Sequence, residues 1–180
     1  MSVLLALDPG KRRHGDRRRC GAALFVDGLL LAASHVDALV VEGDPELAAC
    51  VRQALAVRAW VVGALGADLA VHEVASEWPR VYPGPRQEGD QNDLPPLAGV
   101  ACAVGALFPG AVLHSYDART WKGGAVDKRV MNDRVWERLS AEERARVARL
   151  PRGGLSHDCL DAVGVGLHHL GRLARRRVYA

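Results

Sequence analysis

Two aspartates close to the C-terminus have a spacing that suits metal chemistry. They lie in the segment His157-Asp158-Cys159-Leu160-Asp161. In a helix, residues i and i+3 share one face with their Cβ atoms about 5–6 Å apart. Carboxylates that close repel each other unless a cation or a proton neutralises them, and hard divalent ions prefer such oxygen ligands. A metal site explains the pair. The alternative is that both acids simply occupy a favourable first helical turn.

A third acid, Asp8, ends the first apolar stretch of the chain. It follows Val3-Leu4-Leu5-Ala6-Leu7 and precedes Pro9-Gly10, a pattern typical of a buried strand that stops at a turn. No capping role is evident for Asp8, and a terminal helix packed across that strand end would bring Asp158 and Asp161 to it. Two Mg²⁺ ions about 3.5–4 Å apart, held by such acids, can activate water and stabilise the leaving oxygen in phosphodiester hydrolysis. The acids therefore suggest a nuclease.

The elements that must position these acids follow from hydrophobic periodicity and turn signals. Strands are predicted at 3–7, 21–26, 29–36, 68–77 and 111–116, and helices at 45–65, 93–107, 126–139, after the Ser140 capping box, and at 156–175. Asp27-Gly28 predicts a tight hairpin turn, and 117–125 is expected to be a loop. The order predicts an α/β fold, a five-stranded mixed sheet with helices on both faces. Gly164 and Gly166 in the last helix predict close packing against that sheet.

Length and composition limit the class of protein. With 180 residues, 49% of them hydrophobic, we expect one domain over residues 1–180. The apolar stretches look too short to cross a bilayer and no signal peptide is evident, so we expect a cytoplasmic protein without a membrane span. The four cysteines lack paired spacing and are interpreted as core thiols.

The net charge of +3 does not by itself indicate nucleic acid binding, but the basic residues are clustered. Two clusters could face phosphates: Lys11, Arg12, Arg13, Arg17, Arg18 and Arg19 after the first strand, and Arg172, Arg175, Arg176 and Arg177 at the C-terminus. A solvated loop and a solvated tail are the alternatives.

Taken together, the motifs resemble the RuvC-type Holliday junction resolvases of the RNase H superfamily. The similarity rests on Leu-Asp-Pro-Gly after the first strand, a strand-end glutamate after the first helix, and Asp-x-x-Asp-Ala at the start of a glycine-containing last helix. The segment Trp121-Lys122-Gly123 is similar to phage-encoded members. The resemblance spans nearly the whole chain. It implies an RNase H-like fold, catalysis by two Mg²⁺ ions for which Mn²⁺ can substitute, a homodimer, and paired nicks across a four-way DNA junction. A phage origin would place the protein in the host cytoplasm.

The resemblance also assigns roles to particular residues. Asp8 matches the first-strand aspartate of the family, and Asp158 and Asp161 match its helical acids. For the strand-end glutamate, Glu73 has the usual spacing, whereas Glu77 opens a Glu-Trp-Pro-Arg-Val-Tyr segment similar to that of phage members. Both glutamates lie on one strand face, and we prefer Glu77 because it is nearer the strand end. All five acids are candidate catalytic metal ligands.

Further residues are candidates for DNA contacts. Lys122 is expected to place a positive charge on a phosphate in catalysis, and Lys128 and Arg129 to extend that surface. Trp121 could stack on an unpaired base or pack in the core. His157 could assist as a ligand or proton carrier, or point to solvent. The candidate DNA-binding side chains thus include Lys122, Lys128 and Arg129, together with Lys11, Arg12 and Arg13.

The helix from Asp93 to Leu107 matches the dimer helix of the family, although a helix buried within one chain would look the same. Three other functions remain open at this point: a broader flap or branched-DNA nuclease, a DNA-binding member that has lost its metals, and a sugar-kinase-like nucleotide binder. The absence of a phosphate-binding glycine loop from the sequence counts against the last of these.

Overall fold

The fold is built on a mixed β-sheet. The computed structural model describes residues 1–10, 13–14, 17–39, 41–66, 70–79, 94–123, 127–147 and 157–173. The strands are β1 (Val3–Asp8), β2 (Arg13–His14), β3 (Arg17–Val26), β4 (Leu29–Leu39), β5 (Glu73–Trp78) and β6 (Val112–Asp117). The helices are α1 (Glu46–Leu65), α2 (Leu94–Ala106), α3 (Ala118–Lys122), α4 (Lys128–Glu137), α5 (Ala141–Ala145) and α6 (His157–His169). Apart from the two-residue β2, this is the predicted five-stranded mixed sheet.

The strand order is β2-β3-β1-β5-β6, with β4 paired to β3. Strand β1 lies in the middle, antiparallel to β3 and parallel to β5, and β5 is parallel to β6. The β3–β4 hairpin turns at Asp27 and Gly28, whose φ angles of 48° and 79° are both positive. Such angles characterise the tight turn that an Asp-Gly pair predicts.

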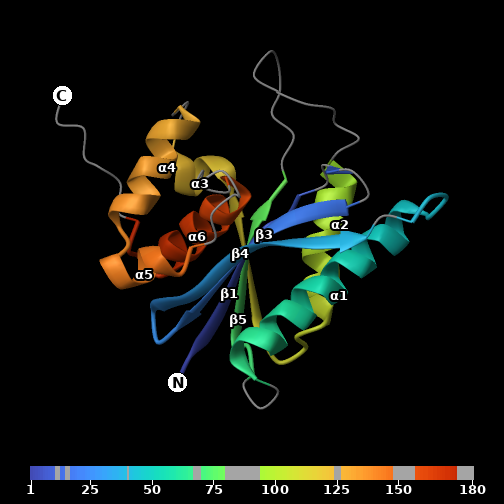
Figure 1. Ribbon diagram of the computed structural model, residues 1–180, viewed down its shortest axis with the longest axis horizontal. Coiled ribbons are helices and arrows are strands. Elements are labelled where there is room, and N and C mark those ends of the chain that lie inside the picture. Colours follow the sequence, from blue (N-terminus) through green and yellow to red (C-terminus); the bar gives the residue numbers. More distant parts are fainter. Residues whose placement is uncertain are drawn as a thin grey trace.

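Helix α6 covers one face of the sheet, with α3, α4 and α5 beside it (Figure 1). Its glycines permit close packing, as expected from the sequence. A Cβ at Gly166 would lie 2.2 Å from Cε2 of Phe25 on β3, and one at Gly164 would lie 2.4 Å from Cζ3 of Trp121 on α3. These two positions therefore need glycine because the neighbouring rings leave no room for a side chain.

Helices α1 and α2 cover the opposite face and pack against each other (Figure 1). By length and composition α1 could cross a membrane, with 33% of its most apolar window buried. A core helix passes the same test, and Val57 and Val61 of α1 are buried in the core on this face of the sheet. The expectation of no membrane span stays a prediction.

Several expectations differ from the structure. Strand β5 begins at Glu73 rather than at residue 68, and the segment expected to be a loop contains α3, which Asp117 caps by accepting a hydrogen bond from the backbone N–H of Arg119 at 2.8 Å. Cys102 is exposed, so the core interpretation is wrong for this thiol and right for Cys20, Cys50 and Cys159. Helix α6 ends at His169, earlier than expected, and Gly171 follows with a φ of 68°.

Candidate active site

Strands β1 and β5 bring two acids to the same edge of the sheet. The parallel register pairs Leu4 with Glu73 and Leu7 with Ser76, so the next pair along the strands is Asp8 and Glu77. Side chains alternate between the two faces along a strand. Since Leu4 and Ala6 pack in the core under α6, Asp8 points to the face that α6 covers, and Glu77 follows Glu73 and Ala75 to the same face.

Helix α6 adds its N-terminal acids at this edge. Gly21 of β3 pairs with Asp8, and a Cβ at Gly21 would lie 1.8 Å from the carbonyl oxygen of Asp158. The backbone of the first turn of α6 therefore lies directly on β3 beside Asp8. Asp161, one turn further on, is buried with 7% of its surface exposed. The structure thus brings together Asp8, Glu77, Asp158 and Asp161, as the sequence predicted.

Helix α3 contributes a cation to this acidic cluster. The Nζ atom of Lys122 lies 3.1 Å from Oε2 of Glu77 and 3.1 Å from Oδ2 of Asp161. The indole Nε1 of Trp121 donates a hydrogen bond to the same Glu77 oxygen at 3.0 Å. Because Trp121 is anchored against Gly164 of α6, it fixes the position of Glu77 relative to the helix that carries Asp161.

The electrostatics of the cluster reflect crowded negative charge. Burial, followed by repulsion from Glu77 and Asp161, raises the pKa of Asp8 well above its ordinary value. Burial also raises the pKa of Glu77, although Lys122 opposes this shift. Burial lowers the pKa of Lys122, but attraction to Glu77, Asp161 and Asp8 outweighs that effect and raises it overall. Burial and neighbouring acids make these carboxylates costly to ionise, and a nearby cation stabilises their ionised form.

This donor set fits a divalent metal ion. Four carboxylates and one ammonium leave a formal charge of −3 when all are ionised, and hard divalent ions take oxygen ligands of this kind. The ammonium of Lys122 already lies between two of the carboxylates, at a place where positive charge is favoured. Asp8, Glu77, Asp158 and Asp161 are thus the residues that could hold metal ions.

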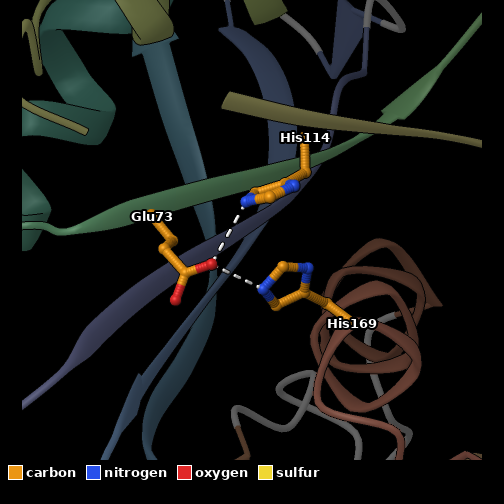
Figure 2. Close-up of side chains that lie close together, drawn as sticks. All are labelled: Glu73, His114 and His169. Carbon is orange, nitrogen blue, oxygen red and sulfur yellow. Dashed lines mark hydrogen bonds and ion pairs between the residues drawn. The ribbon is translucent and has the colours of Figure 1, made fainter. Parts of the chain in front are cut away.

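Glu73 lies apart from this site, at the opposite end of β5. Four residues separate it from Glu77, about 13 Å along a strand. Its Oε2 atom lies 3.1 Å from Nε2 of His114 and 2.9 Å from Nε2 of His169 (Figure 2). The length of the strand carries Glu73 away from Asp8 and Asp161, so the structure does not bring it together with the other four acids, and a catalytic role for it stays a prediction. The preference for Glu77 agrees with the geometry.

The predicted DNA contacts are placed in different ways. Trp121 has 2% of its surface exposed, so it packs in the core and cannot stack on a base in this conformation. Arg129 is exposed in the first turn of α4, which Lys128 begins. Lys11 and Arg12 lie outside the described residues, and Arg13 lies in the short β2. His157 is exposed and accepts a hydrogen bond at Nδ1 from the amide of Asn132 at 2.6 Å.

Three arginines of the predicted phosphate-facing clusters are engaged within the chain. Arg18 is 7% exposed and pairs with Glu46, and Arg19 pairs with Asp37 at 2.9 Å. Arg172 pairs with Glu143 at 2.8 Å. Carboxylates pair with these guanidinium groups within the chain, and their assignment to a phosphate-binding surface stays a prediction. Arg175, Arg176 and Arg177 lie outside the described residues.

The sequence interpretation missed the two histidines around Glu73. His114 lies on β6 and His169 ends α6, so neither forms a motif with the other along the chain. The available signal was a histidine on the strand next to the one that carries Glu73, together with the His168-His169 pair in the last helix. Only the register of β5 and β6, which pairs Glu73 with Val112, brings His114 within reach.

The fold of this chain is similar to that of two Holliday junction resolvases of known structure. Thermus thermophilus RuvC matches with a TM-score of 0.52 and 17% identity, over 94% of this chain and 97% of RuvC. Ydc2, the yeast mitochondrial Holliday junction resolvase, matches with a TM-score of 0.53 and 12% identity, over 96% of this chain and 82% of Ydc2. No family model and no curated protein sequence matches the chain. The predicted fold is thereby confirmed.

Proposed function

We propose that this chain is a divalent-metal-dependent endonuclease that resolves four-way DNA junctions. The observation that carries the proposal is the convergence of Asp8, Glu77 and Asp161 around the ammonium of Lys122. These acids come from two strands and a terminal helix, and simple structural needs would not gather them. The fold shared with a Holliday junction resolvase supports the choice of substrate.

In the proposed reaction, two bound Mg²⁺ ions would supply an activated water and would neutralise the charge that develops on the leaving oxygen. The residues that would hold these ions are Asp8, Glu77, Asp158 and Asp161. The ammonium of Lys122 turns from the carboxylates to the scissile phosphate, a charge-assisted contact that orients it for attack. Trp121 keeps Glu77 in place through its indole hydrogen bond. Mn²⁺, which has similar ligand preferences, substitutes for Mg²⁺.

The active form is a symmetric homodimer, because paired nicks across a junction need two equivalent sites. The α1–α2 side of the molecule supports this proposal. Val100 and Val104 of α2 are buried within the chain, but Leu47, Val51 and Leu55 follow one another along α1 as exposed apolar side chains. Sedimentation velocity should show a dimer, and a monomer at micromolar concentration would oppose the proposal.

The protein is proposed to act in the cytoplasm.

The direct test incubates the protein with a four-way junction, a flap, a nicked duplex and an RNA–DNA hybrid, with and without Mg²⁺. Symmetric nicks in the junction that depend on Mg²⁺ are the expected result. Equal cleavage of flap and junction would replace the resolvase by a broader branched-DNA nuclease of the same fold. Cleavage that persists in a chelator would remove metal-dependent catalysis from the proposal.

The position of Lys122 favours one second candidate, a DNA-binding member without catalysis. An ammonium between Glu77 and Asp161 could replace metal ions permanently rather than yield to them. Calorimetric titration with Mg²⁺ or Mn²⁺ separates the two functions. Heat of binding that disappears in Asp161→Asn supports the nuclease, and no binding of either ion, together with tight junction binding, supports the second candidate.

A further inference from the structure

A second cluster of ligand-type side chains lies at the other end of α6. It joins three elements: Glu73 begins β5, His114 lies on β6, and His169 is the last residue of α6 (Figure 2). The three candidate ligand atoms all lie within 4.8 Å of one another. Eight residues separate His169 from Asp161, about 12 Å along the helix. The cluster is therefore separate from the acidic site, and its chemistry does not depend on nuclease activity.

We infer that Glu73, His114 and His169 form a binding site for one Zn²⁺ ion. Two imidazoles and one carboxylate are a ligand set that zinc takes in proteins, with a water in the fourth position. Zinc bonds of about 2.0–2.2 Å in a tetrahedron put neighbouring ligand atoms about 3.3–3.5 Å apart. The two distances from Oε2 of Glu73, 3.1 and 2.9 Å, need only a few tenths of an ångström of adjustment.

The orientation of His169 supports the site. Its Nδ1 atom lies 2.8 Å from the hydroxyl of Tyr116, which leaves Nε2 turned towards Glu73. A hydrogen bond to the second ring nitrogen is the usual way in which a protein holds a zinc-binding histidine in one orientation. Tyr116 lies on β6 two residues after His114, so one strand supplies both a ligand and the group that orients another ligand.

Access and charge also suit a cation. The side chains of Glu73 and His114 are 34% and 32% exposed and that of His169 is 12% exposed, so an ion can enter and a water can complete its coordination. Without a metal, both imidazoles must direct an N–H at one carboxylate oxygen. When zinc binds at Nε2, the proton of each neutral imidazole moves to Nδ1, and the charge of the ion is partly neutralised by Glu73. The bound ion would link the end of α6 to β5 and β6.

The test is calorimetric titration of the whole protein with Zn²⁺ in excess Mg²⁺, which occupies the acidic site. We expect one Zn²⁺ per chain in the wild type and an increase in melting temperature on binding. Glu73→Gln and His169→Gln should each weaken Zn²⁺ binding by more than about 100-fold, because each removes a ligand. Tyr116→Phe should weaken it by about tenfold, since removing a group that orients a ligand typically lowers metal affinity 10–100-fold. His157→Gln removes an exposed histidine from the other end of α6 and should bind Zn²⁺ like the wild type.

Co²⁺ provides a readout that needs no variant and therefore no assumption about folding. The wild type should give the strong visible absorption of four-coordinate Co²⁺, and Zn²⁺ should displace it. The weak spectrum of octahedral Co²⁺ alone would overturn the site. Unchanged Zn²⁺ affinity in both Glu73→Gln and His169→Gln would overturn it as well, and would leave these residues as a hydrogen-bonded network.

Discussion

At the level of residues, the structure separates two glutamates that the sequence left as alternatives. Glu77 shares a cluster with Asp8, Asp161 and Lys122, whereas Glu73 contacts two histidines. Both point to the same face of β5, so alternation along the strand could not distinguish them. Their neighbours on β1, β6 and α6 do.

This separation predicts different effects on DNA cleavage. Glu77→Gln should lower the rate of junction cleavage by more than about 100-fold, because removing a proposed metal ligand lowers activity more than removing a group outside the metal site. Glu73→Gln should lower the rate by less than about tenfold. Single-turnover cleavage at saturating Mg²⁺ measures both rates. Equal losses in the two variants would show that the distance between the clusters has no functional meaning.

At the level of elements, the close approach of α6 to β3 sets the geometry of the acidic site. Gly21→Ala should displace the first turn of α6, since the new Cβ would overlap the carbonyl of Asp158. We expect a loss of about 1–3 kcal/mol or more in the free energy of unfolding, the usual cost of overpacking, together with a loss of cleavage. Urea denaturation and the cleavage assay measure the two effects.

Gly63→Ala is the matched control for that substitution. Gly63 lies on the exposed side of α1, and a Cβ there would meet nothing within 4 Å. Since alanine favours a helix over glycine by up to about 1 kcal/mol, this variant should be slightly more stable. A Gly21→Ala protein as stable and as active as Gly63→Ala would show that α6 is not held against β3 at this point.

The far end of α6 is held by a buried ion pair whose contribution depends on pH. Arg172 donates to both carboxylate oxygens of Glu143 at 2.8 Å, and the backbone N–H of Leu30 donates to the same group at 2.9 Å. The hydrogen bonds from Arg172 lower the pKa of Glu143 from 4.5 to about 2, although burial opposes them. A lowered pKa in the folded state means that the ionised group stabilises the fold.

That contribution, about 3 kcal/mol, should be fully present above pH 4.5 and disappear as the pH falls towards 2. Glu143→Gln should therefore destabilise the protein at pH 7 and make little difference near pH 2, as measured by urea denaturation across this range. Glu142→Gln removes an exposed neighbouring charge and should have little effect at either pH. A difference between Glu143→Gln and wild type that does not change with pH would contradict this role for the carboxylate.

The elements also show how far the sequence was informative. Local patterns sufficed for the presence of the five longer strands, although not for the start of β5, and for the Asp27-Gly28 hairpin and the Ser140 capping box, because each depends on a few adjacent residues. The acids at the ends of β1 and α6 were found because turn and helix signals flank them. The histidine cluster was not found, because it depends on the pairing of β5 with β6 and on the point where α6 ends.

For the whole molecule, α6 is the element that joins the two sites. Its first turns place Asp158 and Asp161 beside Asp8, and its last residue meets Glu73 and His114. The fold as a whole is similar to those of RuvC and Ydc2, although the identities are only 17% and 12%. Trp121, a predicted DNA contact, is buried and serves the fold instead.

The most direct test of the acidic site as a catalytic metal centre is Asp161→Asn, which removes charge without changing volume. Junction binding measured by gel shift and Mg²⁺-dependent cleavage should be compared in the variant and the wild type. We expect junction affinity to remain and cleavage to fall by more than about 100-fold. Cleavage at the wild-type rate would show that Asp161 does not belong to the catalytic site and that the clustered acids have another role.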